Sequence, residues 1–62
     1  MEIENLIGYP KDEVIQILKE NKIDFDMVFV GDLKNFDTQL LVKFEYIMNK
    51  LTLYFDNFIL NV

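Results

Sequence analysis

The sequence predicts an α+β domain in which one amphipathic helix packs on a small, mostly antiparallel sheet of three to four strands. Two observations predict this fold class. Apolar residues recur with helical spacing in one segment near the start of the chain, and three later segments alternate apolar and polar residues as strands do. A length of 62 residues, of which 52% are hydrophobic, predicts a single small domain over residues 1–62.

A helix is predicted over residues 10–21, after an extended entry segment that ends with residues 6–10. Pro10 suits the first turn of a helix because its φ angle is fixed near the helical value and it has no N–H to leave unsatisfied. Asn21 tolerates the left-handed conformation with which helices often end. The apolar stripe of this helix consists of Val14, Ile17 and Leu18, with Ile15 beside it.

Three strands are predicted after the helix, over residues 23–30, 40–47 and 51–56. Residues 58–62 are a candidate for a fourth, short edge strand. The alternation within each strand indicates which side chains face the core. They are Ile23, Phe25, Met27 and Phe29 in the first strand, Leu40, Val42, Phe44 and Tyr46 in the second, and Leu51, Leu53 and Phe55 in the third.

Turn-forming residues mark the connections between these strands. Residues 31–39 form a loop that Leu33 and Phe36 are expected to anchor to the core. Residues 48–50 form a tight turn, and residues 56–57 form a bend.

The opposite face of the predicted sheet is more apolar than a face in contact with water needs to be. A partner protein or a second copy of the chain would cover such a face, so a homodimer is one expected state. The apolar residues predicted on it are Val28, Val30, Leu41, Ile47 and Tyr54.

Charge is concentrated in the first part of the chain. Residues 1–37 hold four lysines and nine carboxylates, for a net charge of −5, whereas residues 38–62 hold two of each and are neutral. An acidic half disfavours nucleic acid or an anionic membrane as a direct partner, and it favours a basic protein surface. The charge also has a simpler interpretation, which is that it keeps an apolar domain in solution.

Catalysis is not expected. The chain lacks histidine, cysteine and serine, which removes the usual nucleophiles and the bases that titrate near neutral pH. Asp24 and Asp26 share one strand face, where two solvated carboxylates are a better interpretation than an acid and base pair. The loop residues Asp32, Asn35 and Asp37 lack the ligand spacing of a calcium loop. We therefore predict no catalytic residue, no metal and no cofactor.

A cytoplasmic location is expected because the chain has no cysteine, no basic signal-peptide start and no apolar run that approaches the ~20 residues of a membrane span. The absence of alanine and arginine, together with many isoleucines, asparagines and lysines, indicates an AT-rich coding genome and hints at a phage.

The segments ENLIGYPKDEVIQILKENK and VKFEYIMNKLTLYFDN together resemble the potato inhibitor I family of protease inhibitors. The resemblance implies a helix, a strand, an exposed inhibitory loop and further strands. It places Phe44 in the specificity pocket of a protease, followed by Glu45. The regular alternation from Leu40 to Tyr46 instead favours a paired strand with Phe44 in the core, which leaves residues 31–39 as the better functional loop. The residues that carry the first match are Leu6, Ile7, Gly8, Asp12, Glu13, Val14, Ile17 and Leu18.

These observations lead us to expect a non-catalytic protein that binds and inhibits a partner protein, either a protease or a basic protein. Two alternatives remain open. One is an acidic, phage-type inhibitor of a nucleic-acid-binding protein, in which Asp24, Asp26, Asp32 and Asp37 mimic phosphates, and the other is a self-associating structural module. The candidate partner-binding residues are Asp24, Asp26, Asp32, Phe36, Asp37, Phe44 and Glu45.

Overall fold

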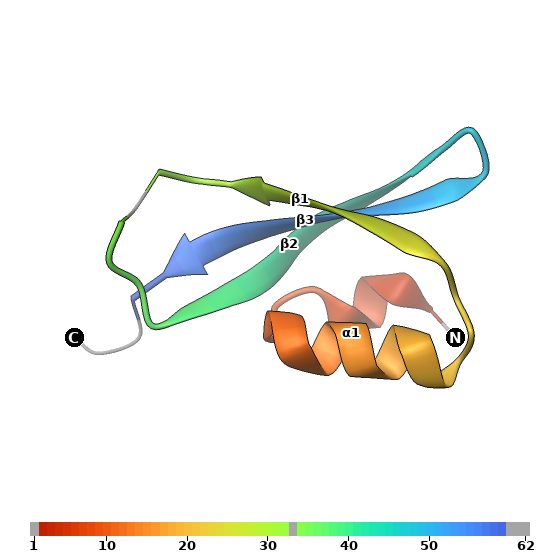
Figure 1. The fold of residues 1–62 in the computed structure, drawn as a ribbon, viewed down its shortest axis with the longest axis horizontal. Helices are drawn as coiled ribbons and strands as arrows, with labels where there is room; N and C mark the ends of the chain where they lie inside the picture. Colours follow the sequence, from red (N-terminus) through yellow and green to blue (C-terminus); the bar gives the residue numbers. More distant parts are fainter. Residues whose placement is uncertain (1, 33, 60–62) are drawn as a thin grey trace.

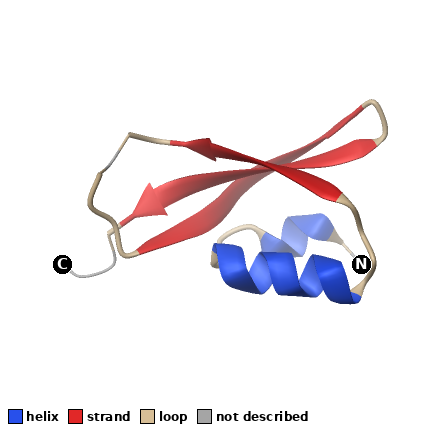
Figure 2. Ribbon diagram, in the orientation of Figure 1, coloured by secondary structure: helices blue, strands red, loops and turns tan. Residues whose placement is uncertain are grey.

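The computed structural model of the protein describes residues 2–32 and 34–59. Its helices and strands confirm the predicted α+β class, with three strands in the described part of the chain. The sheet forms one layer, and both helices lie against the same face of it (Figures 1 and 2). In chain order the elements are the 3-10 helix η1 (Ile3–Leu6), the helix α1 (Lys11–Glu20), and the strands β1 (Phe25–Val30), β2 (Thr38–Ile47) and β3 (Lys50–Phe58).

Helix α1 begins and ends within one residue of the predicted limits. Pro10 is the N-cap and has an extended ψ of 148°, so the helix starts at the next residue. At the other end Asn21 has a φ of −92° and is not left-handed; Lys22 takes that conformation, with a φ of 57°. The Asn21 side-chain amide donates to the carbonyl of Ile17 at 2.8 Å. This bond satisfies a terminal carbonyl of the helix, and the chain reverses one residue later than expected.

The chain enters the domain through η1 rather than through an extended segment. The helical turn directs both Ile3 and Leu6 into the core, where each is 5% exposed. An extended segment would have placed residues three apart on opposite faces, so burial of this pair requires the helical turn.

Strand β3 is the centre of a mixed sheet with the order β1-β3-β2. It pairs in parallel with β1 and antiparallel with β2, so one of the two pairings is parallel. Its inward side chains, Leu51, Leu53 and Phe55, are at most 2% exposed, as predicted. The core also contains Ile3, Leu6, Val14, Leu18 and Leu41.

A β-bulge in β2 changes which side chains of its first half point into the core, compared with the prediction from alternation. Leu41 pairs with Phe55 but Lys43 pairs with Tyr54, so Val42 is an extra residue between them. The extra residue shifts the alternation by one position. Leu41 is consequently fully buried, and the prediction that Val42 faces the core is wrong, since Val42 is 37% exposed.

The end of β3 also differs from the prediction. The predicted bend at Asp56 and Asn57 is wrong, because both residues lie in β3, which continues to Phe58. Gln39 stabilises this extension by donating its side-chain amide to Asn57 Oδ1 at 2.9 Å. The predicted fourth strand therefore loses its first residue to β3, and its last three positions, 60–62, lie outside the described residues. The predicted anchor Leu33 lies outside them as well.

Gly31, the residue after β1, tests whether its close approach to Asp56 of β3 contributes to stability. It has a φ of +99°, and a Cβ atom placed on it would collide with the carboxylate of Asp56, which accepts the N–H of Asn57 at 2.7 Å. Gly31→Ala is expected to lower the free energy of unfolding by about 1–3 kcal/mol, measured by urea denaturation. The matched control is Gly8→Ala, because Gly8 has a φ of +94° but open space around its Cβ position. Equal losses for both variants would show that the contact with Asp56 is unimportant.

Candidate protein-binding surface

Large apolar side chains remain exposed on both faces of the sheet: on one face because the sheet is longer than the helix that covers it, and on the other because both helices lie on the first face. The ten residues of α1 span about 15 Å, whereas the ten residues of β2 span about 30 Å. The helices therefore lie under only part of the sheet, and the β2–β3 hairpin extends beyond them (Figure 2). The exposed large apolar residues of the described chain are Ile7, Tyr9, Met27, Val28, Phe29, Val30, Phe36, Val42, Tyr46, Ile47, Met48 and Ile59.

The two most exposed of these residues, Met48 and Tyr46, lie in the hairpin tip, which we define as residues 46–49. Tyr46, Ile47 and Met48 are 65%, 47% and 95% exposed, although Tyr46 is predicted from the alternation to face the core. Met48 and Asn49 both have positive φ angles, of 52° and 67°, as a two-residue type I′ hairpin turn requires. Asparagine, aspartate and glycine are the usual residues at such positions, so Met48 occupies an unfavourable backbone conformation.

Sequence reasoning identified this turn but not the tip as a surface. The signal that could have found it is the methionine at a turn position that normally takes a polar residue or glycine.

The four candidate aspartates lie at the two ends of β1. Asp24 and Asp26 lie at its beginning, where Asp26 forms an ion pair with Lys50 at 3.4 Å. Asp32 and Asp37 lie in the connection after its end. Asp26 and Asp32 are six residues apart, about 20 Å of extended chain. The structure therefore places the four aspartates in two separate pairs rather than in one continuous row.

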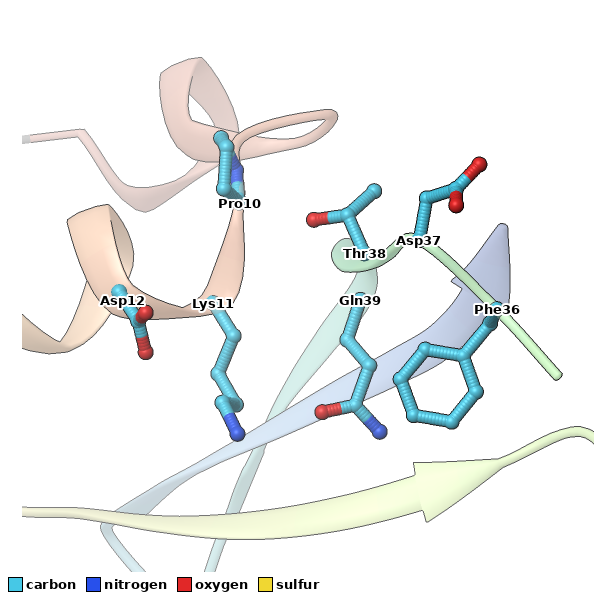
Figure 3. Close-up of a pocket in the computed structure, with 7 residues that line it drawn as sticks. All are labelled: Pro10, Lys11, Asp12, Phe36, Asp37, Thr38 and Gln39. Atoms are coloured by element: carbon cyan, nitrogen blue, oxygen red, sulfur yellow. The ribbon is translucent and has the colours of Figure 1, made fainter. Parts of the chain in front are cut away.

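Phe36 and Asp37 lie beside the beginning of α1, at an open hollow of about 190 Å³. Figure 3 shows the side chains of Phe36, Gln39 and Lys11 directed to the same side of the hollow, with Asp37 directed away from them. The Lys11 ammonium lies 5.6 Å from the centre of the Phe29 ring. Phe36 is 44% exposed and Asp37 is also exposed, so the hollow does not exclude water as a catalytic site would.

Phe44 and Glu45 lie in β2, on opposite faces of the sheet. Phe44 pairs with Leu53 and packs partly buried against the core, with its ring 6.2 Å from that of Tyr46. Residues 42–46 thus form a paired strand, as the alternation predicted, rather than the exposed loop that the inhibitor resemblance implies. Phe44 is not presented for insertion into a protease pocket.

Glu45 belongs to a polar cluster on the open face of the sheet. Its carboxylate forms an ion pair with Lys43 at 2.6 Å and accepts a hydrogen bond from the Tyr54 hydroxyl at 3.4 Å. The hydrogen bond and charge of Lys43 lower the pKa of Glu45 below its ordinary value, and Glu45 in turn raises the pKa of Lys43. The positive charge of Lys43 and the negative charge of Glu45 therefore balance each other on this part of the hairpin.

Comparisons of this chain with protein-family models, with curated proteins and with solved structures give no match. Within residues 2–32 and 34–59, no three acidic side chains gather closely enough to hold a metal ion. The helices of this described part are also too short or too polar to cross a membrane.

The pair of Lys43 and Glu45 predicts a pH dependence of stability. Because the pKa of Glu45 is lowered in the folded state, the stabilising effect of its charge is complete at neutral pH and is lost as the pH falls from the ordinary glutamate pKa through that lowered pKa. The difference in free energy of unfolding between the native chain and Glu45→Gln should therefore shrink as the pH falls through this range. Urea denaturation at a series of pH values measures it, and Glu4→Gln is the control for loss of one surface charge. A difference for Glu45→Gln that stays constant with pH would contradict the role of this pair.

Proposed function

We propose that this chain is a non-catalytic protein-binding module that inhibits a partner protein by filling an apolar pocket on the partner with the hairpin tip. The observation that carries the proposal is Met48, which is 95% exposed at a positive φ angle. A residue in a costly conformation, with an apolar side chain in water, indicates a functional use of that position.

The chemistry of the tip suits a protein pocket. Methionine is flexible and polarisable, so it adapts to irregular apolar sites, and tyrosine is among the residues that contribute most to protein interfaces. Burial of a side chain such as Met48 or Ile47 in a pocket contributes about 1.5–3 kcal/mol. Met48 at the turn, with Tyr46 and Ile47 on the two faces of the strand before it, therefore presents apolar surface on which binding could draw.

The shape and charge of the hairpin support the same function. The hairpin, cyan in Figure 1, extends past the helices, so its end can enter a concave site without a clash from the rest of the domain. The charged residues nearest its tip are paired, Lys43 with Glu45 and Lys50 with Asp26. Binding at the tip consequently does not require burial of an unpaired charge. A projecting element that fills a pocket also excludes the natural ligand of that pocket, which is how the module would inhibit.

The proposal places the module and its partner in the cytoplasm, because a chain without cysteine is compatible with a reducing compartment. The partner is a protein, and the module has no cofactor of its own.

A pair of matched variants tests the proposal. Met48→Asn removes the apolar side chain and introduces a residue that favours the turn, so the fold is expected to be retained or slightly stabilised. Phe36→Asn makes the same change in the loop after β1, where Phe36 is 44% exposed. Immobilised native chain and both variants are incubated with lysate of the source cell, and bound proteins are quantified by mass spectrometry. Circular dichroism checks that each variant is folded.

We expect a captured protein whose recovery falls at least tenfold with Met48→Asn and is unchanged with Phe36→Asn. That protein is then titrated in purified form, and its activity should fall on binding of the native chain only. Equal recovery with the native chain and Met48→Asn would overturn the proposal, as would loss with Phe36→Asn alone, because the loop would then be the binding surface.

A further inference from the structure

The two edges of the sheet differ in how their backbone groups are covered. On the outer side of β2, the N–H of Gly8 donates to the carbonyl of Leu41 at 2.8 Å, and the N–H of Leu41 donates to the carbonyl of Tyr9 at 3.0 Å. Pro10 also bridges to Leu40. Strand β1, by contrast, pairs with β3 on one side, and no strand of the described chain lies along its other side. The outer edge of β1 is therefore open to another strand.

Strand β1 also lacks the features with which proteins protect an open edge. Such edges usually carry lysine, proline or a bulge. The β1 sequence, FDMVFV, has one charged residue, Asp26, and its pairing with β3 is regular throughout. Met27, Val28, Phe29 and Val30 are 41%, 38%, 50% and 38% exposed, so both faces of the strand present apolar side chains. An apolar edge of this kind favours the addition of a strand.

From this contrast we infer that β1 pairs antiparallel with β1 of a second copy of the chain, joining two sheets into one continuous six-stranded sheet. The apolar sequence of β1 itself favours a second copy as the occupant of this edge. In a symmetric antiparallel pair centred on Met27, directly opposite residues share a face, so Phe25 lies opposite Phe29 of the second copy. Asp26 lies opposite Val28 of the second copy, and the two Asp26 carboxylates are not opposed. They lie on diagonal positions about 7–8 Å apart, where each keeps its ion pair with Lys50 of its own chain, and the directly opposed pairs of Phe25 with Phe29 supply apolar contact.

The apolar ladder of such a dimer would extend one that already exists within each chain. Phe29 stacks on Phe55 of the core, with ring centres 5.9 Å apart. The second copy would place its own Phe25 beside Phe29 and continue this row across the interface. Strand pairing alone buries less than the roughly 800 Å² per partner of a standard interface. We therefore expect a dissociation constant in the micromolar range rather than an obligate dimer.

This interface is separate from the hairpin tip, so the two proposals can fail independently. The tip is formed by the β2–β3 hairpin, whereas the open edge belongs to β1. Met48→Asn should leave the dimer intact, and loss of the dimer should leave the tip exposed.

The first test is the mass of the purified native chain, measured by light scattering over a micromolar concentration series. We expect the apparent mass to rise twofold with concentration. Val28→Lys places a charge on the open edge and should keep the mass at that of one chain. The matched control is Val42→Lys on β2, since Val28 and Val42 are 38% and 37% exposed, and it should still form the dimer. A native chain that remains a monomer throughout the series, or a folded Val28→Lys variant that remains a dimer, would overturn the inference.

The second test does not depend on the folding of Val28→Lys. Because the chain has no cysteine, Met27→Cys introduces a single thiol. In the Met27-centred pairing the two thiols lie on opposed residues whose Cα atoms are about 4.5–5.5 Å apart, which permits a disulfide. Mild oxidation should convert Met27→Cys to a covalent dimer much faster than Met48→Cys, although Met48 is more exposed. Faster cross-linking of Met48→Cys, or equal rates for both variants, would contradict pairing through β1.

Discussion

The central position of β3 is the constraint on which the rest of this structure depends. As the middle strand it pairs on both sides, and its inward residues Leu51, Leu53 and Phe55 provide the base of the core. Val14 and Leu18 of α1 pack in the same cluster. A domain of this size buries only about 60% of the surface of its unfolded chain, so there is no second core to compensate for damage to this one. Strands β1 and β2 are placed by their pairing with β3, and α1 and η1 lie against β2.

Coverage of that sheet is incomplete for a simple geometric reason. A strand rises about 3.3 Å per residue and a helix about 1.5 Å, so a ten-residue helix cannot cover a ten-residue strand. The uncovered parts are the far end of the β2–β3 hairpin and the open strand β1. The apolar side chains left in those two places, such as Met48 and Phe29, are the ones from which the proposed interactions follow. The mismatch in length between the two layers thus accounts for the exposure of Phe29 on the helix face, whereas Val28 and Val30 are exposed because both helices lie on the other face.

Local signals in the sequence were sufficient for the helix and for the alternation of β3. The apolar stripe and Pro10 located α1 to within one residue at each end, because these signals act over a single turn. The bulge at Val42 was not predictable in the same way. Its position depends on the register between β2 and β3, which is a relation between distant segments, and a shift of one residue exchanges the two faces of a strand. Prediction of the candidate site succeeded and failed for the same reason. Phe44 lies after the bulge and packs against the core, as the alternation predicted. The exposure of the hairpin tip depends on tertiary structure, and the sequence did not predict it.

The sequence by itself determined the α+β class, the order of α1 and the three strands, and the lack of histidine, cysteine and serine, but not the 3-10 helix η1. These properties follow from composition and from periodicity within short segments. Only the tertiary structure decided that β3 lies between β1 and β2, that the outer edge of β1 is open, and that Met48 extends beyond the helices. The physical reason is that exposure and strand pairing depend on which distant segments meet, and no local pattern of apolar and polar residues contains that information.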